Sequence, residues 1–506
     1  MFSKVLSASI LGMEVCPVQV EADISNGLPS FIMVGYVSSQ VKEAQDRVKT
    51  ALKNTGIYLP PKKITVNFSP SNIKKEGAGF DLPVAAAVLA AAQLYPGQRL
   101  EGMFLAGELS LSGKVNGIWG ILPMVAKARE LGCHTCLIPR ENVKEGRMIE
   151  GIRVIGISSV KEMLDYLRGK EIPSVPLQKE KAPEETYRED FSHIQGQAAA
   201  KRALEIAVSG FHNLLLVGPP GCGKSMMARC VPSVFPPLSR EESLELTRIY
   251  SIAGLLSAEN PVMRNRPFRA PHHTASPQAM AGGGRIPRPG EITLAHRGVL
   301  FLDEMPEFSR GSLEILRQPL EEKKIRLSRA SGTYTFPADF LLLAAMNPCP
   351  CGHYPDVERC SCTRQEIERY TKKISHSLLE RMDLCVETMP VKFQEAAAGR
   401  KEETSREIRK RVERVHQIQS ERYKDRSIRF NGELSAADIS RYCSLSAEGK
   451  ILMEQAYESL HLSVRSYHRV LKTARTIADM EEREEIGVSH LTEALTYRMS
   501  GFRSWE

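Results

Sequence analysis

The chain has 506 residues, 42% of them hydrophobic and 25% charged, so it is long enough for two or three folded domains. No run of 18 or more apolar residues occurs, which excludes a protein built from apolar membrane spans. The formal net charge of +8 permits a nucleic-acid partner without requiring one.

The N-terminal residues predict a cytoplasmic protein. Residues 1–4 lead directly into patterned sequence, without the apolar core and cleavage site of a secretory signal peptide. Several of the 11 cysteines, such as Cys16, Cys136 and Cys385, stand alone in apolar surroundings, which is typical of reduced, buried thiols. We therefore expect no structural disulfides.

Residues 1–167 are predicted to form an α/β domain. Alternating apolar residues indicate strands around Leu11, Met13 and Val15, then around Val18 and Val20, and later over residues 64–68. Apolar residues with helical spacing predict helices over residues 41–52, 82–93 and 123–131. Residues 168–189 are charged, contain prolines and have few large apolar side chains, so they are predicted to be a linker.

A phosphate-binding loop follows the apolar strand predicted at residues 214–217. Glycines allow backbone N–H groups to turn around a phosphate, a lysine supplies a positive charge, and a following hydroxyl can bind Mg²⁺. The loop consists of Gly218, Pro219, Pro220, Gly221, Cys222, Gly223, Lys224 and Ser225. Its position between a strand and a helix predicts binding and hydrolysis of ATP.

Residues 238–300 are too long for a simple link to the next strand, so they are predicted to contain an insertion. It carries Arg264, Arg266 and Arg269, followed by His272 and His273, around the aromatic Phe268. Residues 282–285 resemble a flexible loop tip that ends in Arg285. Arg269 and Arg285 are therefore candidates for contact with nucleic acid.

A carboxylate pair, Asp303 and Glu304, ends the apolar run at residues 299–302. In a doubly wound sheet such a pair lies at the carboxyl edge, where ligands bind. Asp303 can hold Mg²⁺, and Glu304 can polarise the water that attacks the γ-phosphate. A second strand at residues 340–346 ends at Asn347, whose amide could sense that phosphate.

A basic hairpin is predicted over residues 323–336. Lys324, Arg326 and Ser328 alternate with Ile325 and Leu327, so one strand face is basic and the other apolar. With Lys323 and Arg329, these cations could follow a phosphate backbone without reading sequence. The alternative is an ordinary solvated edge whose lysines discourage aggregation.

Four cysteines in two C-x-C pairs, Cys349 with Cys351 and Cys360 with Cys362, suit a tetrahedral Zn²⁺ site. The spacing is tighter than the common one, and His353 could replace one thiol. Redox-sensitive or simply packed cysteines remain alternatives. Because the loop follows Asn347, it is predicted to be a structural staple outside the hydrolytic centre.

Residues 392–506 are predicted to be a helical region. Apolar residues with a helical period occur over residues 402–423, 435–441, 446–460, 466–482 and 489–499. Arg465, at the start of the fourth helix, is a candidate for contact with the γ-phosphate. Arg381 precedes another apolar segment and could neutralise transition-state charge in a neighbouring subunit, or could pair with Asp383 or Glu380 on the surface.

The sequence resembles the Mg-chelatase-like AAA+ ATPases of the ComM or YifB type over nearly its whole length. The resemblance rests on IQGQ at 194–197, FRAPHHT at 268–274, GEITLAHRG at 290–298, AMNPCPCG at 345–352 and SYHR at 466–469. It implies an AAA+ core over residues 190–391 and a helical lid over residues 392–506. It also implies that Ile194 contacts nucleotide, that Asn347 and Arg465 are sensors, and that Arg381 is an arginine finger.

The resemblance also implies a function. Such a protein would form a ring, expected to be a hexamer, and use ATP and Mg²⁺ to move along single-stranded, forked or branched DNA. Helicase or branch-migration activity during homologous recombination and natural transformation would follow, with recombination proteins as partners. In the related clade, an insertion in helix 2 and a hairpin before sensor 1 point into the pore.

Residues 1–167 resemble the proteolytic domain of Lon without its catalytic pair. Residues 75–80 occupy the place of the nucleophile motif, but Gly79 stands at the serine position and Leu122 at the lysine position. A Ser-Lys dyad needs a hydroxyl and an amine, so no peptidase activity is expected, although Lys114 and Lys127 are not far away. Two alternatives remain: a Lon-like protease, and a Mg-chelatase-like ATPase that remodels a protein and does not act on DNA.

Overall fold

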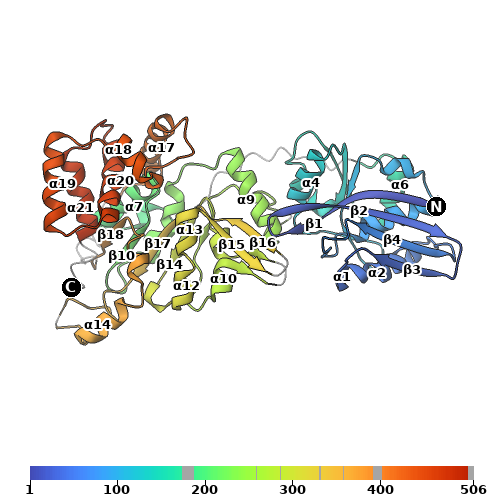
Figure 1. Cartoon of the computed structure of the whole chain (residues 1–506), viewed down its shortest axis with the longest axis horizontal. Helices are drawn as coiled ribbons and strands as arrows, with labels where there is room; N and C mark the ends of the chain where they lie inside the picture. Colours follow the sequence, from blue (N-terminus) through green and yellow to red (C-terminus); the bar gives the residue numbers. More distant parts are fainter. Residues whose placement is uncertain are drawn as a thin grey trace.

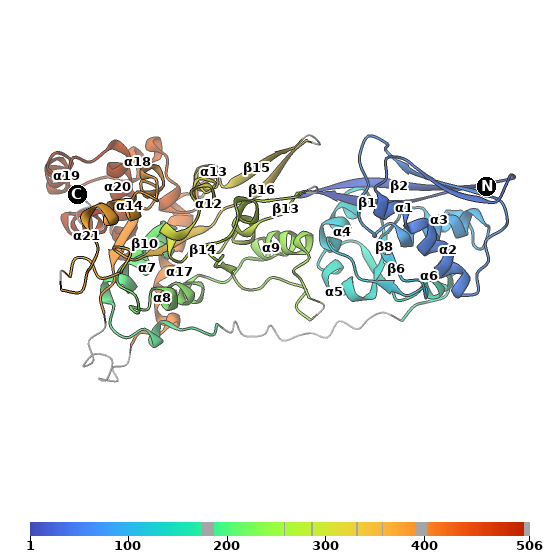
Figure 2. The ribbon, with the colours of Figure 1, turned by 90° about the horizontal axis from the view of Figure 1, so that it is seen from below.

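The computed structural model describes residues 1–173, 187–257, 259–284, 287–329, 332–356, 358–390 and 402–499. The molecule is elongated, with the N-terminal α/β region at one end, the parallel ATPase sheet in the middle and the C-terminal helices at the other end (Figures 1 and 2). The predicted fold class, an α/β Lon-like region followed by an AAA+ core and a helical lid, is confirmed.

The N-terminal region is built on a seven-stranded mixed sheet in the order β3-β4-β2-β1-β5-β8-β9. The first two strands form a long antiparallel hairpin, whereas β5, β8 and β9 are parallel. The strands are β1 (Phe2–Leu11), β2 (Glu14–Ser25), β3 (Ser30–Val34), β4 (Lys63–Ser69), β5 (Met103–Leu105), β8 (Thr135–Pro139) and β9 (Arg153–Ile157), with β6 (Glu108–Leu109) and β7 (Val115–Asn116) forming a separate short pair.

Helices cover this sheet. They are α1 (Ser39–Lys42), α2 (Ala44–Asn54), α3 (Asp81–Ala91), α4 (Ile121–Glu130), α5 (Val143–Gly146) and α6 (Val160–Leu167), with 3-10 turns η1 (Gly97–Leu100) and η2 (Arg140–Asn142). Every residue of α3 is buried, since this alanine-rich helix packs between the sheet and α2. The predicted helices at residues 41–52, 82–93 and 123–131 correspond to α1 with α2, to α3 and to α4.

The alternation of Leu11, Met13 and Val15 does not mark a single strand, and that prediction was wrong. Leu11 ends β1 and Val15 lies in β2, with the hairpin turn between them. Gly12 has a φ of +64°, a left-handed conformation that glycine adopts without steric cost. Only the end of β1 was predicted, because Ser3, Ser7 and Ser9 occupy buried positions in this strand and interrupt the apolar alternation.

The central region contains a five-stranded parallel sheet in the order β11-β14-β17-β10-β18. Its inner strands are buried on both faces, which explains their uninterrupted apolar sequences. The strands are β10 (Leu214–Val217), β11 (Phe268–Arg269), β14 (Val299–Leu302), β17 (Leu341–Met346) and β18 (Leu384–Glu387).

Two short antiparallel hairpins project from this region. The insertion hairpin is β12 (Gly282–Gly283) with β13 (Arg288–Pro289), and the pre-sensor hairpin is β15 (Lys324–Arg329) with β16 (Gly332–Pro337). The helices are α7 (Ala198–Gly210), α8 (Lys224–Cys230), α9 (Arg240–Ala253), α10 (Pro277–Ala281), α11 (Glu291–Leu294), α12 (Arg310–Glu314), α13 (Arg317–Glu322), α14 (Arg364–Thr371) and α15 (His376–Leu379), with turns η3 (Phe191–His193), η4 (Val231–Val234) and η5 (Met305–Glu307).

The C-terminal region is helical, as predicted, and each predicted helix lies within about three residues of an observed one. The elements are α17 (Ser405–Arg422), η6 (Asn431–Glu433), α18 (Ala436–Tyr442), α19 (Ala447–Ser459), α20 (Val464–Met480) and α21 (Val488–Met499). Thr404, Ser435, Ser446 and Ser463 accept N-cap hydrogen bonds at the starts of α17 to α20.

A buried polar network joins this helical region to the ATPase sheet. His212, which precedes β10, contacts Thr476 of α20 with 2.7 Å between Nε2 and Oγ1. Asn431 donates to Asp479 at 2.8 Å, and His416 of α17 lies 3.0 Å from the carbonyl oxygen of Val208. Burial lowers the pKa of both histidines to about 4, so both are neutral at pH 7.

All 11 cysteines are free thiols. Among the described residues, no helix combines the length and apolarity needed to cross a bilayer.

Candidate functional site

The phosphate-binding loop lies between β10 and α8, as predicted. Gly221 and Gly223 have φ values of +81° and +80°, so both occupy the left-handed conformation that favours glycine. A Cβ built at Gly218 would lie 2.1 Å from Thr388 Oγ1, because the loop passes closely over the residue that follows β18. The backbone path therefore requires glycine at these positions.

Lys224, the first residue of α8, points back into the loop. Its ammonium donates to the carbonyl oxygens of Gly218 and Pro219 at 2.7 and 2.9 Å, and to Asn347 Oδ1 at 3.2 Å. Burial lowers the pKa of Lys224. The predicted sensor amide at the end of β17 is thus within hydrogen-bond distance of the predicted phosphate-binding lysine.

The predicted Mg²⁺ ligands also come together. Ser225 Oγ donates to Asp303 Oδ2 at 2.6 Å, across the gap between α8 and the end of β14. A hydroxyl and a carboxylate in contact are oxygen donors of the kind that Mg²⁺ prefers. The Glu304 amide donates to Asp303 Oδ1 at 3.0 Å, which fixes the orientation of that carboxylate.

Glu304 has a φ of +50°, a left-handed conformation that is rare for a residue with a side chain. Such conformations cost about 1–3 kcal/mol and gather at functional sites. The backbone here turns sharply from β14 into η5, and the Glu304 side chain remains 57% exposed. The carboxylate is therefore available to a water molecule at the edge of the nucleotide site.

A further residue lies next to this carboxylate and was not assigned to the nucleotide site from sequence. His273 Nδ1 lies 3.7 Å from Glu304 Oε2, and the His272 ring lies 4.1 Å from the His273 ring. His273 belongs to the loop between β11 and α10, which leads into the insertion hairpin. The FRAPHHT string at 268–274 supports the family resemblance and a basic segment, but nothing local in it predicts the contact of His273 with Glu304.

The remaining predicted nucleotide-binding residues surround the loop. Ile194 is buried in the hydrophobic core directly before Gly196 and Gln197, and Gln197 Nε2 donates to the Cys222 carbonyl oxygen at 3.4 Å. The segment that carries Ile194 is therefore tied to the phosphate loop. Pro220 contacts the cysteine loop, since a Cβ built at Gly352 would lie 2.6 Å from Pro220 Cδ.

Arg381 and Arg465 lie together at another edge. The Arg381 side chain is 9% exposed and its guanidinium pairs with Glu321 and donates to the Ser377 carbonyl oxygen. Arg465, 66% exposed, pairs with Glu380 at 3.4 Å. Within the described residues, neither arginine hydrogen-bonds to Lys224, Ser225 or Asp303, so their assignment as finger and sensor stays a prediction.

The insertion and pre-sensor hairpins are neighbours. A Cβ built at Gly283 would lie 3.2 Å from Arg329 Nη2, so the end of β15 reaches the insertion hairpin. Arg326 is 51% exposed and 3.4 Å from Glu322, while Arg329 is exposed and Lys324 half-buried. Three predicted DNA-binding cations therefore share one hairpin strand.

Other predicted DNA-binding residues are engaged within the chain. Arg269 makes a bidentate contact with Glu291, at 2.7 Å for both hydrogen bonds. Lys323 pairs with Glu433 and lies 3.5 Å from Asp339. These two cations stabilise the fold in this state, and Arg285 lies outside the described residues.

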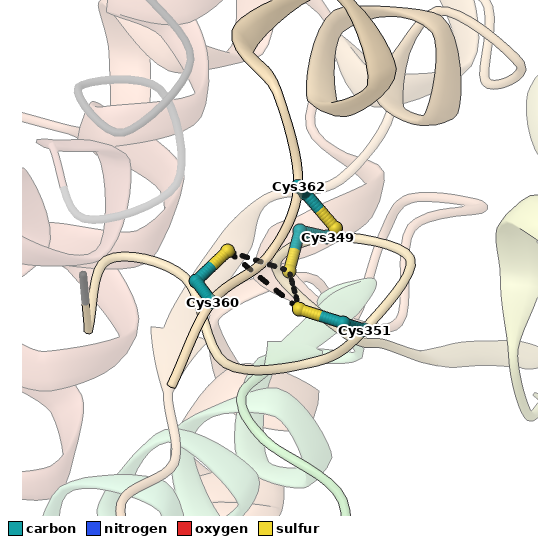
Figure 3. Close-up of side chains that lie close together, drawn as sticks. All are labelled: Cys349, Cys351, Cys360 and Cys362. Carbon is teal, nitrogen blue, oxygen red and sulfur yellow. Dashed lines mark hydrogen bonds between the residues drawn. The ribbon is translucent and has the colours of Figure 1, made fainter. Parts of the chain in front are cut away.

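The predicted metal-binding cysteines converge (Figure 3). The Sγ atoms of Cys349, Cys351, Cys360 and Cys362 all lie within 4.8 Å of one another. Cys349 Sγ is 3.3 Å from Cys351 Sγ and 3.7 Å from Cys360 Sγ. Ligands about 2.3 Å from a tetrahedral ion are separated by roughly 3.8 Å, so this donor set fits Zn²⁺.

In the N-terminal region, residues 75–80 end at the start of α3. Lys75 is fully buried and its ammonium donates to the carbonyl oxygens of Gly35 and Pro70. Gly79 faces Ile118, and the Leu122 amide donates to buried Glu145 at 2.9 Å. Lys114 and Lys127 pair with Glu141 and Glu130.

Comparison with known proteins agrees with this architecture. The family models described as "Magnesium chelatase, subunit ChlI", "Subunit ChlI of Mg-chelatase" and "Magnesium chelatase, subunit ChlI C-terminal" match residues 190–396, 20–142 and 402–498. The chain is 41% identical to the uncharacterized protein YifB of Salmonella typhimurium over 96% of this chain and 95% of that protein. It is 40% identical to the competence protein ComM of Haemophilus influenzae, over 98% and 97% of the two chains.

The chain also has a shorter similarity. Lon protease 2 of Bacillus subtilis is 30% identical over 130 residues, which cover 26% of this chain and 23% of that protein. Because the two full-length matches extend over nearly the entire sequence, the chain belongs to the ComM/YifB family of magnesium-chelatase-like proteins.

Proposed function

We propose that this protein is a ring-forming ATPase that couples ATP hydrolysis to movement along DNA. The observation that carries the ATPase assignment is the convergence of Lys224, Ser225, Asp303 and Asn347 at the carboxyl edge of the parallel sheet. We assign the N-terminal region to residues 1–167, a linker to 168–189, the ATPase core to 190–391 and the lid to 392–506.

In this proposal the loop amides and Lys224 hold the phosphates of ATP. Ser225 and Asp303 would hold Mg²⁺, which neutralises charge that develops on the phosphate oxygens. Glu304 orients the attacking water and accepts its proton. Asn347, already 3.2 Å from the Lys224 ammonium, reports the presence of the γ-phosphate to β17 and the cysteine loop.

The ring is inferred from the family and from Arg381 and Arg465. Arg381 pairs with Glu321, and Arg465 pairs with Glu380, the residue before Arg381. We propose Arg381 as the residue that serves a neighbouring subunit and Arg465 as a sensor of the γ-phosphate. Arg381 would have to release Glu321 before it could reach a neighbour's nucleotide. A hexamer is the expected assembly.

DNA is the proposed track because exposed cations line the pre-sensor hairpin. Lys324 and Arg326 lie on one face of β15, whereas Arg329, three residues after Arg326, points to the other face near the end of the hairpin, so the three cations present positive charge on both sides of this strand. A relative of this chain is named competence protein ComM. We therefore propose a helicase or branch-migration role in homologous recombination during natural transformation, in the cytoplasm and with recombination proteins as partners.

The cysteine cluster is proposed to bind one structural Zn²⁺ through Cys349, Cys351, Cys360 and Cys362. Their loop contacts Pro220 and Asn347 through Gly352, so the ion would rigidify one wall of the nucleotide site. Metal analysis should give one zinc per chain, lost in a Cys360→Ser, Cys362→Ser variant. A full complement of zinc in that variant would contradict this assignment.

The second candidate function is remodelling of a protein partner, as the family models' name, magnesium chelatase, permits. A strand-displacement assay on a fluorescent forked duplex separates the two. We expect ATP-dependent displacement by the native protein and none by Glu304→Gln. Failure to displace forked, duplex or four-way substrates, together with hydrolysis stimulated only by a protein, would favour the second candidate.

A further inference from the structure

A cleft of about 610 Å³ lies between the N-terminal region and the ATPase insertion. One wall contains Glu76, residues 77–80 and Trp119, which includes the Lon-like nucleophile position at Gly79. The opposite side is formed by Ile252 of α9 and by Pro287 and Arg288 of the insertion hairpin. The insertion hairpin of the ATPase region therefore forms part of one side of this cleft.

One contact across the cleft joins a cation to an aromatic ring. The Arg288 guanidinium lies 4.6 Å from the centre of the Trp119 ring, a cation–π distance. Trp119 also packs against the end of α9, since a Cβ built at Gly254 would lie 2.7 Å from its Cδ2 atom. Even so, Trp119 is 57% exposed, so one side of the indole faces the cleft and solvent.

The same N-terminal region also reaches the pre-sensor hairpin. The turn between β1 and β2 contacts Tyr334 of β16, whose Cδ1 would lie 2.9 Å from a Cβ built at Gly12. Met13 packs with hydrophobic residues of both the ATPase core and α9, and its carbonyl oxygen accepts a hydrogen bond from Arg248 at 2.9 Å. Both candidate DNA hairpins therefore contact the N-terminal region.

The interface around these contacts is polar and specific. The Gly120 amide donates to the Ser251 carbonyl oxygen at 3.1 Å, and Ser251 Oγ donates to buried Glu145 at 2.5 Å. Arg240 and Glu150 add an exposed ion pair at the rim. These hydrogen bonds hold α9, and with it the start of the insertion, in one position.

The charge of the cleft explains why it accepts an arginine. Its N-terminal wall carries the carboxylates of Glu43, Glu76 and Glu108, of which Glu76 pairs with Lys74 at 2.6 Å and Glu43 with Arg47 at 3.4 Å. The guanidinium in the same wall, Arg47, donates to buried Asp81 at 2.8 and 3.0 Å. Carboxylates outnumber cations in this wall, and with the Trp119 ring they favour a cation such as Arg288 over a phosphate.

We propose that the degenerate protease cleft is a docking surface for the insertion hairpin, which it holds away from DNA until DNA competes for Arg288. The proposal rests on the proposed DNA-motor function. The N-terminal region would then act as a clamp on the hairpin. DNA binding breaks the contact between Trp119 and Arg288 and frees the hairpin for the ATPase cycle.

The fluorescence emission of Trp119 can report on this contact. The sequence contains two tryptophans, and the other one, Trp505, can be replaced. In full-length Trp505→Phe protein, oligothymidine should change the Trp119 emission. Arg288→Lys in that background keeps the charge but removes planar stacking, so it should already show the altered emission and respond little to DNA. An equal response to DNA in both proteins would overturn the clamp.

A second experiment measures affinity. Trp119→Ala should tighten binding of fluorescein-labelled oligothymidine roughly two- to fivefold. This factor corresponds to the loss of a cation–π contact of about 0.5–1 kcal/mol, which DNA must break in the native protein. The matched control is Tyr58→Ala, which removes an aromatic ring that is 76% exposed and does not line the cleft. Unchanged or weaker binding by Trp119→Ala, relative to this control, would contradict the proposal.

The two levels of the proposal fail differently. If native protein binds no DNA in the anisotropy assay, the DNA-motor function fails. If native protein binds DNA and hydrolyses ATP faster with it, the DNA-motor function stands. If, in addition, Trp119→Ala does not tighten DNA binding and Arg288→Lys leaves the response of Trp119 emission to DNA unchanged, the docking surface fails.

Discussion

Two glycine-containing turns in this molecule lead into helices, and they differ in what surrounds them. The loop at residues 218–223 precedes α8, and side chains from α8, β14 and β17 converge on it. The turn at residues 77–79 precedes α3, whose first residue, Asp81, is engaged by Arg47. A glycine-containing turn thus precedes a helix in both regions, and we propose a catalytic site at one and a docking surface at the other.

The difference shows that convergent side chains, and not the turn, decide the chemistry. At the nucleotide site, the Lys224 amine contacts Asn347, and the Ser225 hydroxyl contacts the Asp303 carboxylate. The Glu304 carboxylate lies 3.7 Å from His273. The N-terminal region has Gly79, which lines the cleft, and Leu122, which is buried, at the positions where the resemblance to Lon places a hydroxyl and an amine. The walls of the cleft instead provide an aromatic ring and carboxylates, which suit recognition of a cation.

The largest expected effect tests the nucleotide site. Lys224→Ala should lower ATP hydrolysis at least about 100-fold, because the charge that stabilises the transferred phosphate is lost. Lys114→Ala, which removes a 64% exposed lysine of the N-terminal region, is the control and should leave the rate unchanged. Similar rates of ATP hydrolysis by the two variants would contradict the assignment of the nucleotide site to the loop that contains Lys224.

The stability of the ATPase and lid regions should depend on pH, because two buried histidines lie where these regions meet. The pKa values of His212 and His416 are lowered from 6.5 to about 4 by burial, so the unfolded chain binds protons that the folded chain does not between those values. Stability therefore falls as the pH drops from about 6.5 to 4, by about 2 kcal/mol per histidine at pH 5.

Thermal unfolding at pH 7 and pH 5 tests this sign. His416→Gln should reduce the loss between the two pH values by about half, while His134→Gln in the N-terminal region serves as the control. The account is contradicted if the His416 variant loses as much stability on acidification as the native chain.

Because His273 Nδ1 lies 3.7 Å from Glu304 Oε2, we expect it to orient that carboxylate, so that His273→Ala lowers kcat roughly tenfold and leaves the KM for ATP within about twofold. Steady-state hydrolysis measures both constants. His272→Ala is the matched variant and should lower kcat less, since the His272 ring lies 4.1 Å from the His273 ring but its Nδ1 contacts Thr274 at 2.9 Å. A rise in KM with unchanged kcat would show that His273 binds substrate instead.

The smallest expected effect concerns the hairpin. Arg326→Ala with Arg329→Ala should weaken binding of single-stranded DNA a few-fold and lower the slope of log affinity against log salt by roughly 1.4. Arg414→Ala, which removes a lid arginine that is 70% exposed, should not change the slope. An unchanged slope in the hairpin variant would place the DNA elsewhere.

Much of this structure could be predicted from local sequence. The phosphate loop, the carboxylate pair at 303–304 and the C-terminal helices carry strong signals, because glycine turns, apolar strands and N-cap residues act over a few positions. The four cysteines were also predicted to come together, since their spacing is short.

Contacts between distant segments could not be predicted. No periodicity indicates that Arg269 pairs with Glu291, that Arg381 turns to Glu321, or that Arg288 lies over Trp119. The approach of His273 to Glu304 depends on how the insertion folds back over the sheet. The hairpin turn at Gly12 was missed because alternation of apolar residues continues through it.

The measurement that tests the central claim most directly is ATP hydrolysis by the purified protein with and without single-stranded, duplex and four-way DNA, with Glu304→Gln as the blank. We predict strong stimulation by at least one DNA structure, and less stimulation in the Arg326→Ala, Arg329→Ala variant. Hydrolysis that is robust but indifferent to every DNA would contradict a DNA motor.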